Sequence, residues 1–398
     1  MTGVAVAGAG ITRHGFFPAR SWKDLIVEAS LAAVADAGMD LGRIDGGMVS
    51  CTLPETFEQQ NLGAVTADEL GLTPVPFGQL VGACAGGLMA VQAGIRMIQS
   101  GAHRCVLVAG VEKQSDTTTT ADSMLSYVDA DFEAAAGFDF VDTMALMHAR
   151  YLQVHGTSEE AVAAFAVADR WYARHNPVAV DTGRPDITTA DVLDSGWVSK
   201  PITRAACGRA CDGSSAVVLV AADEVPDAPV IAGIAQATGP NGLAAKFGHP
   251  GYDGDIVRAL PTAIAADSAY RQAGIGAGDV DVAQVHDCFT IMGSLHLEGL
   301  GIFPAGKAAL AVQAGETALD GRCPANTDGG RIGLGHPTGT TGINVVVESV
   351  RQLRREAGVR QVRDPEVAVC QAMGGNNSTS AVAVLRRATG RSRHVGAE

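Results

Sequence analysis

Short apolar runs alternate with longer amphipathic stretches along the chain. The β-rich runs at residues 4–12, 45–52 and 105–112 predict strands, and the spacing of apolar positions over residues 22–38 predicts a helix. A glycine-rich turn and a long helical pattern follow each other within residues 81–101. This alternation is typical of an α/β fold in which helices cover the faces of a sheet.

The same order of elements occurs a second time. The second series reads strand, helix, strand, glycine-rich turn with long helix, strand and strand, at residues 229–238, 255–274, 279–289, 329–358, 366–375 and 378–385. Residue identity between the two series is low, so the repeat lies in the order and type of the elements. We therefore predict two pseudo-symmetric α/β halves.

The stretch between the strands predicted at 105–112 and 214–221 is too long for a bare connection. It contains helix-like segments and polar turns, which predict an inserted subdomain; insertions over one mouth of a sheet commonly help to build a ligand site. We expect an N-terminal half (1–114 with 213–226), an inserted loop subdomain (115–212), a C-terminal half (227–388) and a flexible tail (389–398).

The composition argues against several classes of protein. The chain has 29 basic and 43 acidic side chains and a net charge of −14, which argues against a nucleic-acid binder because such proteins need a basic stripe. A local basic patch for one anionic ligand remains compatible with this balance. No basic segment precedes the apolar N-terminal residues and no apolar run is long enough for a membrane span, so we expect neither a secretory signal nor a transmembrane helix.

The eight cysteines are sparse, and several lie inside apolar runs. This usage indicates buried thiols in a reducing compartment, and we expect a cytoplasmic protein. The pair Cys207 and Cys211 has no second ligand pair nearby, so no metal site is predicted. Residues 8–13 lack the third glycine of a dinucleotide fingerprint and are not followed directly by a helix, which argues against a nicotinamide cofactor.

The two glycine-rich turns carry reactive side chains. Cys84 lies in "GACAGG", before the long helix of the first half, and His336 lies in "GLGHPTG", at the matching place in the second half. Two halves related by a pseudo-twofold axis would bring these helix starts together. We expect the positive end of the helix dipole to stabilise a Cys84 thiolate, and His336 to take the thiol proton.

A second cluster lies at the end of a predicted strand, in "VHDCF" at residues 285–289. We expect it to place His286 and Cys288 near Cys84 and His336, and Asp287 to be a local hydrogen-bond partner. "AMGG" at 372–375 follows another strand and would supply backbone N–H groups. Any one of these residues alone would more often be packing or structural, but the combination is typical of acyl transfer through an oxyanion.

These motifs resemble the thiolase superfamily, most closely the sterol-carrier-protein-2-type branch, also called lipid-transfer-protein thiolases. The resemblance runs from roughly residue 3 to residue 386. It rests on "GACAGG", "GVEK", "CDGSSAVVL" and "GGRIGLGHPTGTTG", together with "HDCF", the motif that distinguishes this branch. It implies a thiolase-like fold of five layers, α-β-α-β-α.

The resemblance also implies roles. Cys84 would be the nucleophile that carries the acyl group, while His336 activates it and lines a first oxyanion hole with His286. Many thiolases place a second acid/base cysteine near the C-terminus, but Met373 stands there in this chain, and a thioether cannot shuttle protons. The branch with "HDCF" implies that Cys288 takes this role.

The backbone N–H groups of Cys84 and of Gly374 or Gly375 would form a second oxyanion hole. Coenzyme A is implied as substrate and product, with no bound cofactor. Basic side chains of the inserted region are candidates for binding its phosphates, with solvated surface charge as the plain alternative: Arg170, Arg174, Lys200 and Arg204. A homodimer is expected, with a tetramer as the alternative.

The function expected from these residues is a thiolase-like acyltransferase that forms or cleaves a carbon–carbon bond in CoA thioesters. One alternative is a diverged relative: an aldolase that cleaves a β-hydroxyacyl-CoA side chain, often of a steroid, with a small OB-fold partner, or an acyltransferase of secondary metabolism. Another is a non-catalytic lipid or acyl-CoA carrier. Retention of both cysteines and both histidines counts against the aldolase, and Cys84 and His336 count against the carrier.

Overall fold

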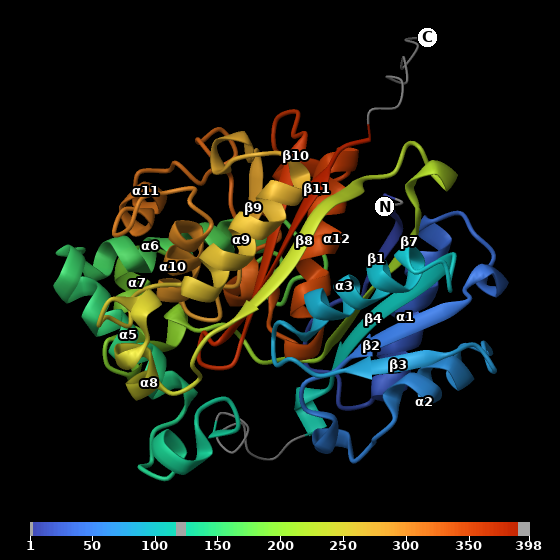
Figure 1. The fold of residues 1–398 in the computed structure, drawn as a ribbon. Helices are drawn as coiled ribbons and strands as arrows, with labels where there is room; N and C mark the ends of the chain where they lie inside the picture. The colour runs from blue at the N-terminus through green and yellow to red at the C-terminus, as the bar shows by residue number, and fades with distance from the viewer. Residues whose placement is uncertain (1–2, 117–124, 389–398) are drawn as a thin grey trace.

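The computed structural model describes residues 3–116 and 125–388 (Figure 1). The predicted flexible tail, 389–398, lies outside the described residues. Within them the largest feature is a nine-stranded mixed sheet with the strand order β3-β2-β4-β7-β1-β8-β11-β10-β9. The order keeps the strands of the two predicted series apart, so each series forms its own contiguous part of the sheet.

The first part of the sheet is built around a fully buried strand, β4, which lies between β2 and β7. β2 pairs in parallel with β3 and β4, whereas β7 runs antiparallel to both β4 and β1. The bounds are β1 (Val4–Ile11), β2 (Gly46–Ser50), β3 (Phe77–Leu80), β4 (Cys105–Glu112) and β7 (Gly213–Ala221). Burial on both faces explains the continuous apolar sequence of β4.

The second part is joined to the first at one corner, because β1 and β8 pair only through Val4–Ile231 and Ala5–Val230. Its strands are β8 (Val230–Thr238), β9 (Val282–Gln284), β10 (Val367–Gly374) and β11 (Thr379–Arg386). β9 is much shorter than the strand predicted at 279–289. The chain leaves the ladder after Gln284, so the "HDCF" residues form an extended connection to helix α10 (Thr290–Gly299).

Helices divide the molecule into five layers. α1 (Trp22–Asp36) and α2 (Leu62–Glu69) cover the outer face of the first part, and α9 (Leu260–Ala273) and α10 cover the outer face of the second. Between the parts lie α3 (Gly86–Gln99) and α12 (Thr341–Arg354), packed in one apolar core with strands of both parts (Figure 1). The predicted α/β fold of thiolase type is thereby confirmed.

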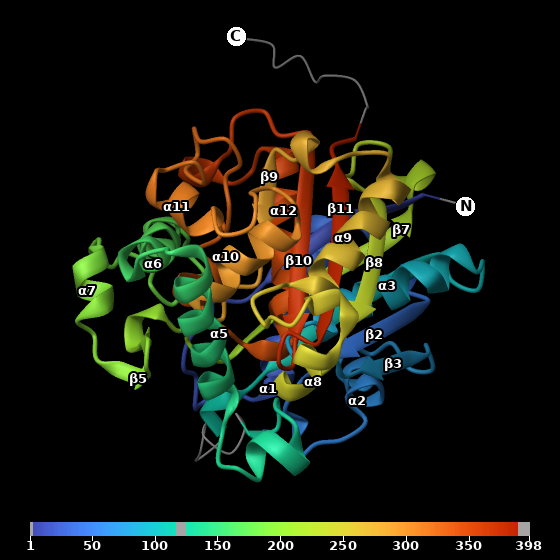
Figure 2. The same cartoon turned by 60° about the vertical axis from the view of Figure 1, so that its left-hand side comes forward.

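The region between β4 and β7 packs beside the second part of the sheet (Figure 2). Its helix α6 contacts α10, α11 and the loop that begins at Gly330. The elements are α5 (Phe140–His155), α6 (Glu159–Arg174), α7 (Thr189–Leu193), β5 (Trp197–Ser199) and β6 (Ile202–Thr203), with α8 (Leu243–Gly248) and α11 (Ala308–Gln313) nearby in the fold. The division of the chain at 115 and 212 stays a prediction.

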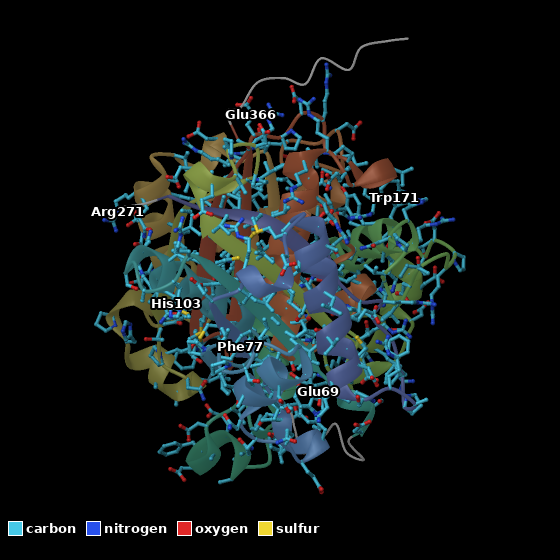
Figure 3. The ribbon with its side chains drawn as sticks, turned by 90° about the vertical axis from the view of Figure 1, so that its right-hand side faces the viewer. Glu69, Phe77, His103, Trp171, Arg271 and Glu366 are labelled. Carbon is cyan, nitrogen blue, oxygen red and sulfur yellow. The ribbon has the colours of Figure 1, made fainter. Side chains whose placement is uncertain are left out.

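An ion pair joins the two helices on the outer surface of the first part. Lys23 of α1 pairs with Glu69 of α2 at 2.6 Å, on the side of the molecule seen in Figure 3. Both side chains are solvent-accessible, so the pair contributes at most about 1 kcal/mol. Among the described residues, no helix combines the length and the apolar character that crossing a membrane requires.

The beginnings of α3 and α12 touch backbone to backbone. Gly342 is the second residue of α12, and a Cβ atom there would lie 2.1 Å from the backbone nitrogen of Leu88. Gly87 is the second residue of α3, and a Cβ there would lie 2.9 Å from the backbone nitrogen of Ile343. Only glycine permits this approach. The turns that precede the two helices are therefore held against each other.

We expect Gly342→Ala to lower the free energy of unfolding by about 1–3 kcal/mol, because the added methyl group meets backbone that cannot rotate away. Higher helix propensity of alanine would act in the opposite direction. The matched control is Gly278→Ala, where a Cβ meets no atom within 4 Å. Urea denaturation of both variants checks the prediction, and a Gly342→Ala variant as stable as the wild type would contradict it.

Candidate active site

Three of the predicted residues meet in one buried cluster. The sulfur of Cys84 and ring nitrogens of His286 and His336 all lie within 4.8 Å of one another. The two imidazole rings stand edge to face, with centroids 5.1 Å apart. A thiol and two imidazoles are the side chains of a thiol–imidazole pair and are also common ligands of Zn²⁺.

Cys84 is presented by a tight turn directly before α3. Ala83, the preceding residue, adopts a left-handed conformation with φ of 48°, which is unfavourable for an L-residue with a Cβ atom. Its carbonyl oxygen accepts a hydrogen bond of 3.1 Å from the hydroxyl of Thr52. This bond from the loop after β2 supports the strained turn and fixes the direction of the thiol.

A single buried carboxylate, Glu112, ties the two halves together beside the cluster. It accepts hydrogen bonds from the backbone N–H groups of Thr52 (3.0 Å) and Leu53 (3.1 Å) in the first half. It also accepts bonds from the Thr338 hydroxyl (2.5 Å) and the Gly339 N–H (2.8 Å), just after His336. Burial raises the pKa of Glu112, while these donors oppose the rise.

The residue after Glu112 makes a second buried link. Lys113 donates to Asp212 at 3.1 Å, and Asp212 also accepts the N–H groups of Phe17 and Ser115, each at 2.8 Å. We assigned no role to Glu112, Lys113 or Asp212 from the sequence. The available signal was a charged pair at the end of an apolar strand, in "GVEK", and an aspartate in "CDGSS".

His336 is held by its backbone and lies near the buried positive charge of Arg331. Its N–H donates to the carbonyl oxygen of Arg209 at 2.7 Å. Burial, and then the guanidinium of Arg331, lower the pKa of His336 to about 3. Arg331 is itself buried and pairs with Asp328 at 2.6 Å. His336 is therefore neutral at physiological pH and can accept a proton.

Cys84 is a thiol rather than the thiolate expected from its place at a helix start. Burial, followed by the charge of Glu112, raises the pKa of Cys84 to about 12. Loss of hydration outweighs the helix dipole because the thiol is shielded from water. The pair of Cys84 and His336 therefore rests as neutral thiol and neutral imidazole, and the proton can move only as the sulfur attacks.

The "HDCF" residues are fixed by their backbone. His286 donates its N–H to the side chain of Gln371 at 2.9 Å, and Gln371 bonds in turn to the hydroxyl of Ser380 at 3.0 Å. Neither ring nitrogen of His286 has a hydrogen-bond partner among the described residues. The carbonyl oxygen of Cys288 accepts the Gly208 N–H at 2.7 Å. Burial and then Cys84 raise the pKa of Cys288 well above its usual value, so it too is protonated.

Asp287 is a structural hydrogen-bond acceptor. It accepts the N–H groups of Arg331 at 2.8 Å and Ile332 at 3.3 Å. Asp169 of α6 faces it, and burial and the neighbouring Asp287 raise the pKa of Asp169 well above its usual value. Asp169 is therefore protonated beside Asp287, and this places the inserted region against the loop before His336. Sequence reasoning did not find Asp169.

The turn after β10 packs directly onto the Cys84 turn. A Cβ atom on Gly374 would lie 2.4 Å from the carbonyl oxygen of Gly82, and Gly375 has a positive φ of 61°. Met373 is fully buried in an apolar cluster with Cys288 and Phe289. The structure thus brings Gly374 and Gly375 beside Cys84, and puts a thioether where many thiolases have a cysteine.

The cations predicted to bind phosphate separate into two groups. Arg170 and Arg204 line a cavity of about 590 Å³, together with Asp181, Arg184 and Arg209. Asp181 pairs with Arg170 at 3.3 Å, with Arg184 at 3.1 Å and with Arg209. In contrast, two predicted cations lie outside its lining: Arg174, which pairs with Asp186, and Lys200, which lies over the ring of Trp197.

None of the four predicted catalytic side chains lines this cavity. Two of these catalytic residues are nevertheless linked to the cavity wall by backbone hydrogen bonds. The wall includes residues 207–210, and within them Gly208 bonds to Cys288 and Arg209 bonds to His336. The cavity and the buried cluster therefore lie on two sides of one chain segment.

Both halves match known families. The family model described as "Thiolase, N-terminal domain" matches residues 4–181, and "Thiolase C-terminal domain-like" matches residues 248–387. The acetyl-CoA acetyltransferase of Methanothermobacter thermautotrophicus is 36% identical over 97% of this chain and 100% of that protein. Sterol carrier protein 2 of Oryctolagus cuniculus is 26% identical over 93% of this chain and 70% of its own length.

A solved structure has a similar fold. The "Ltp2-ChsH2(DUF35) aldolase" structure superposes with a TM-score of 0.83 at 24% identity, over 97% of this chain and 98% of the other. At this identity the likeness concerns the fold alone. Because both halves match thiolase families and one relative is similar over nearly the full length, this chain belongs to the thiolase superfamily.

Proposed function

We propose that the protein is a thiolase-type acyltransferase that cleaves or forms a carbon–carbon bond in CoA thioesters through an acyl group on Cys84. The relatives named acetyl-CoA acetyltransferase support this activity. The observation that carries the roles of the residues is the buried contact of Cys84 with two neutral histidines, since a thiol and an unprotonated base are the requirements for covalent acyl transfer.

In the cleavage direction, the Cys84 sulfur attacks the 3-carbonyl carbon of a 3-ketoacyl-CoA while His336 takes the thiol proton. The π electrons of the carbonyl move to its oxygen and then return as the bond between C2 and C3 breaks. The electron pair of that bond stays on C2, which receives the proton of Cys288. The acyl group remains on Cys84, and acetyl-CoA or propionyl-CoA leaves.

In the second half-reaction, the Cys288 thiolate removes the proton of free CoA, whose sulfur attacks the acyl carbon. Cys84 leaves and recovers its proton from His336, so all groups return to their starting forms. The raised pKa of Cys288 suits the first step, because it keeps the thiol protonated until a carbanion is present. In the synthetic direction the same thiolate would remove the α-proton of the donor thioester.

Two oxyanion holes follow from the same arrangement. His286 and His336 would face the thioester oxygen, supported by the unpartnered ring nitrogens of His286. The backbone N–H groups of Cys84 and of Gly374 or Gly375 would face the oxygen of the attacked carbonyl, supported by the close packing of those two turns. Donors in a dry site stabilise developing charge more strongly than donors in water.

The arginine-lined cavity is the proposed site for the CoA phosphates. Its wall contains four arginines and one aspartate, in a protein whose net charge is −14. Guanidinium groups suit phosphate because they donate two parallel hydrogen bonds. This supports Arg170 and Arg204 from the sequence and adds Arg184 and Arg209. The assignments of Arg174 and Lys200 stay predictions without this support.

A second candidate is supported by a relative named steroid side-chain-cleaving aldolase, from Thermomonospora curvata, which is 28% identical over 87% of this chain and 90% of that protein. An aldolase would cleave a β-hydroxyacyl-CoA instead of a 3-ketoacyl-CoA, with a small partner protein. Retention of Cys84, Cys288, His286 and His336 favours the thiolase reaction. The homodimer, the partner and the cytoplasmic location stay predictions.

Cys84→Ala should remove all covalent acyl-enzyme, because Cys84 is the thiol whose sulfur lies within 4.8 Å of ring nitrogens of both histidines. The measurement is intact-protein mass spectrometry after incubation with a panel of 3-ketoacyl-CoA and β-hydroxyacyl-CoA esters, with product masses recorded. Cys323→Ala, which removes a thiol buried in the core beneath α9 and α10, is the control and should keep the adduct. An acyl adduct on Cys84→Ala would refute the role.

Cys288→Ala should still form an acyl-enzyme from a simple acyl thioester, because that step needs only Cys84 and His336. Carbon–carbon cleavage should fall by about 10²–10⁴-fold, the usual contribution of a positioned acid or base. Stopped assays that separate acylation from 3-ketoacyl-CoA cleavage check this. Equal losses in both reactions, or none in either, would remove Cys288 from the proton transfer.

Alkylation of Cys84 by iodoacetamide should be nearly independent of pH between about pH 6 and 9, because a pKa of about 3 for His336 and about 12 for Cys84 keep the neutral pair intact. His336→Ala removes the base and leaves only the thiolate route. Its rate should be lower and should rise about tenfold per pH unit. A flat profile in the variant would contradict the general-base role.

A further inference from the structure

Tyr127 carries a buried hydroxyl group without a partner. The residue is 7% exposed, and its hydroxyl oxygen makes no hydrogen bond of acceptable geometry with any described residue. Leaving a buried hydroxyl unpaired costs about 1–3 kcal/mol. Such a group is uncommon in native proteins and calls for an explanation. A ligand that supplies the missing partner is one.

The side chain lies against the proposed catalytic residues. Its ring packs on Phe140 with centroids 5.6 Å apart, in the apolar cluster that also contains Cys288 and Met373. The position of a Cβ on Gly375 lies 3.8 Å from the carbonyl oxygen of Tyr127. After burial, the neighbouring group that most raises the pKa of Tyr127 is Cys84. The phenol therefore belongs to the surroundings of the nucleophile.

The nearest polar side chain cannot satisfy the phenol as a donor. Thr338 lies close enough to oppose the rise in the pKa of Tyr127. However, its hydroxyl proton is already donated to Glu112 at 2.5 Å, and its oxygen accepts the Gln114 amide at 3.3 Å. A second lone pair of that oxygen is free, but no hydrogen bond of acceptable geometry joins the two hydroxyl groups, so the proton of Tyr127 is available for a bound acceptor.

We propose that Tyr127 is a further catalytic residue, whose hydroxyl donates a hydrogen bond to the oxygen of the carbonyl that Cys84 attacks. The proposal rests on the thiolase-type function above. That carbonyl must lie beside the Cys84 sulfur and the Gly374–Gly375 turn; the Tyr127 ring shares the apolar cluster of Cys288 and Met373, and its backbone lies against Gly375. As the carbon–sulfur bond forms, the π electrons move onto the oxygen, and a donor in this dry site becomes stronger.

The proposal gives the inserted region a direct part in the reaction. Tyr127 lies in this region, next to the acidic stretch 128–133, and no feature of the local sequence distinguishes it from a surface tyrosine. Its burial raises its pKa well above the ordinary value, so it keeps its proton at physiological pH.

The test compares Tyr127→Phe with Tyr252→Phe. Tyr252 is also a buried tyrosine whose hydroxyl lacks a partner among the described residues, and its ring lies under the ammonium group of Lys246. Each variant loses one oxygen atom and keeps its ring. The measurements are kcat and KM on the 3-ketoacyl-CoA turned over fastest by the wild type, and Tm by thermal unfolding.

Tyr127→Phe should lower kcat/KM by about 10²–10³-fold, mostly through kcat, with Tm equal to or above the wild type because an unpaired hydroxyl is removed. Tyr252→Phe should keep wild-type kinetics. Wild-type kinetics in Tyr127→Phe would overturn the proposal while leaving the thiolase function intact, and so would a loss of activity matched by a lower Tm. A wild-type protein inactive on every ester would overturn both.

Discussion

The contact between Gly87 and Gly342 is the constraint on which the active site depends. These residues lie in the first turns of α3 and α12, and the absence of side chains lets the two backbones touch. The turns that carry Cys84 and His336 immediately precede these helices, so they meet because the helix starts meet. Glu112 strengthens the join, since one carboxylate accepts hydrogen bonds from both halves.

Burial determines the protonation states of the four side chains in the cluster. Cys84, Cys288, His286 and His336 are all buried, and burial is the largest influence on the pKa of each. All four rest in their neutral forms as a result. Burial outweighs the nearby charge of Arg331, which by itself would favour a Cys84 thiolate. Charge therefore develops only during the reaction, where fixed donors stabilise it most.

The inserted region does more than cover the sheet. It supplies Asp169, whose pKa is raised by burial and by Asp287, and it supplies Arg170 and Arg184 of the arginine-lined cavity. It also brings Tyr127 to the nucleophile. These contributions come from segments that differ in structure, namely a helix, a loop and a turn. Substrate preference can therefore change through this region while the two halves keep the reactive pair in place.

The sequence by itself determined the order of strands and helices and the places of Cys84, His286, Cys288 and His336, because apolar periodicity and turn motifs are local signals. The fold class followed from the repeat and the motifs. The tertiary structure alone decided that Cys84 is a thiol, that the strand before "HDCF" ends at Gln284, and which arginines line the cavity. Desolvation and side-chain pairing depend on residues that arrive from distant parts of the chain, and no local pattern records them.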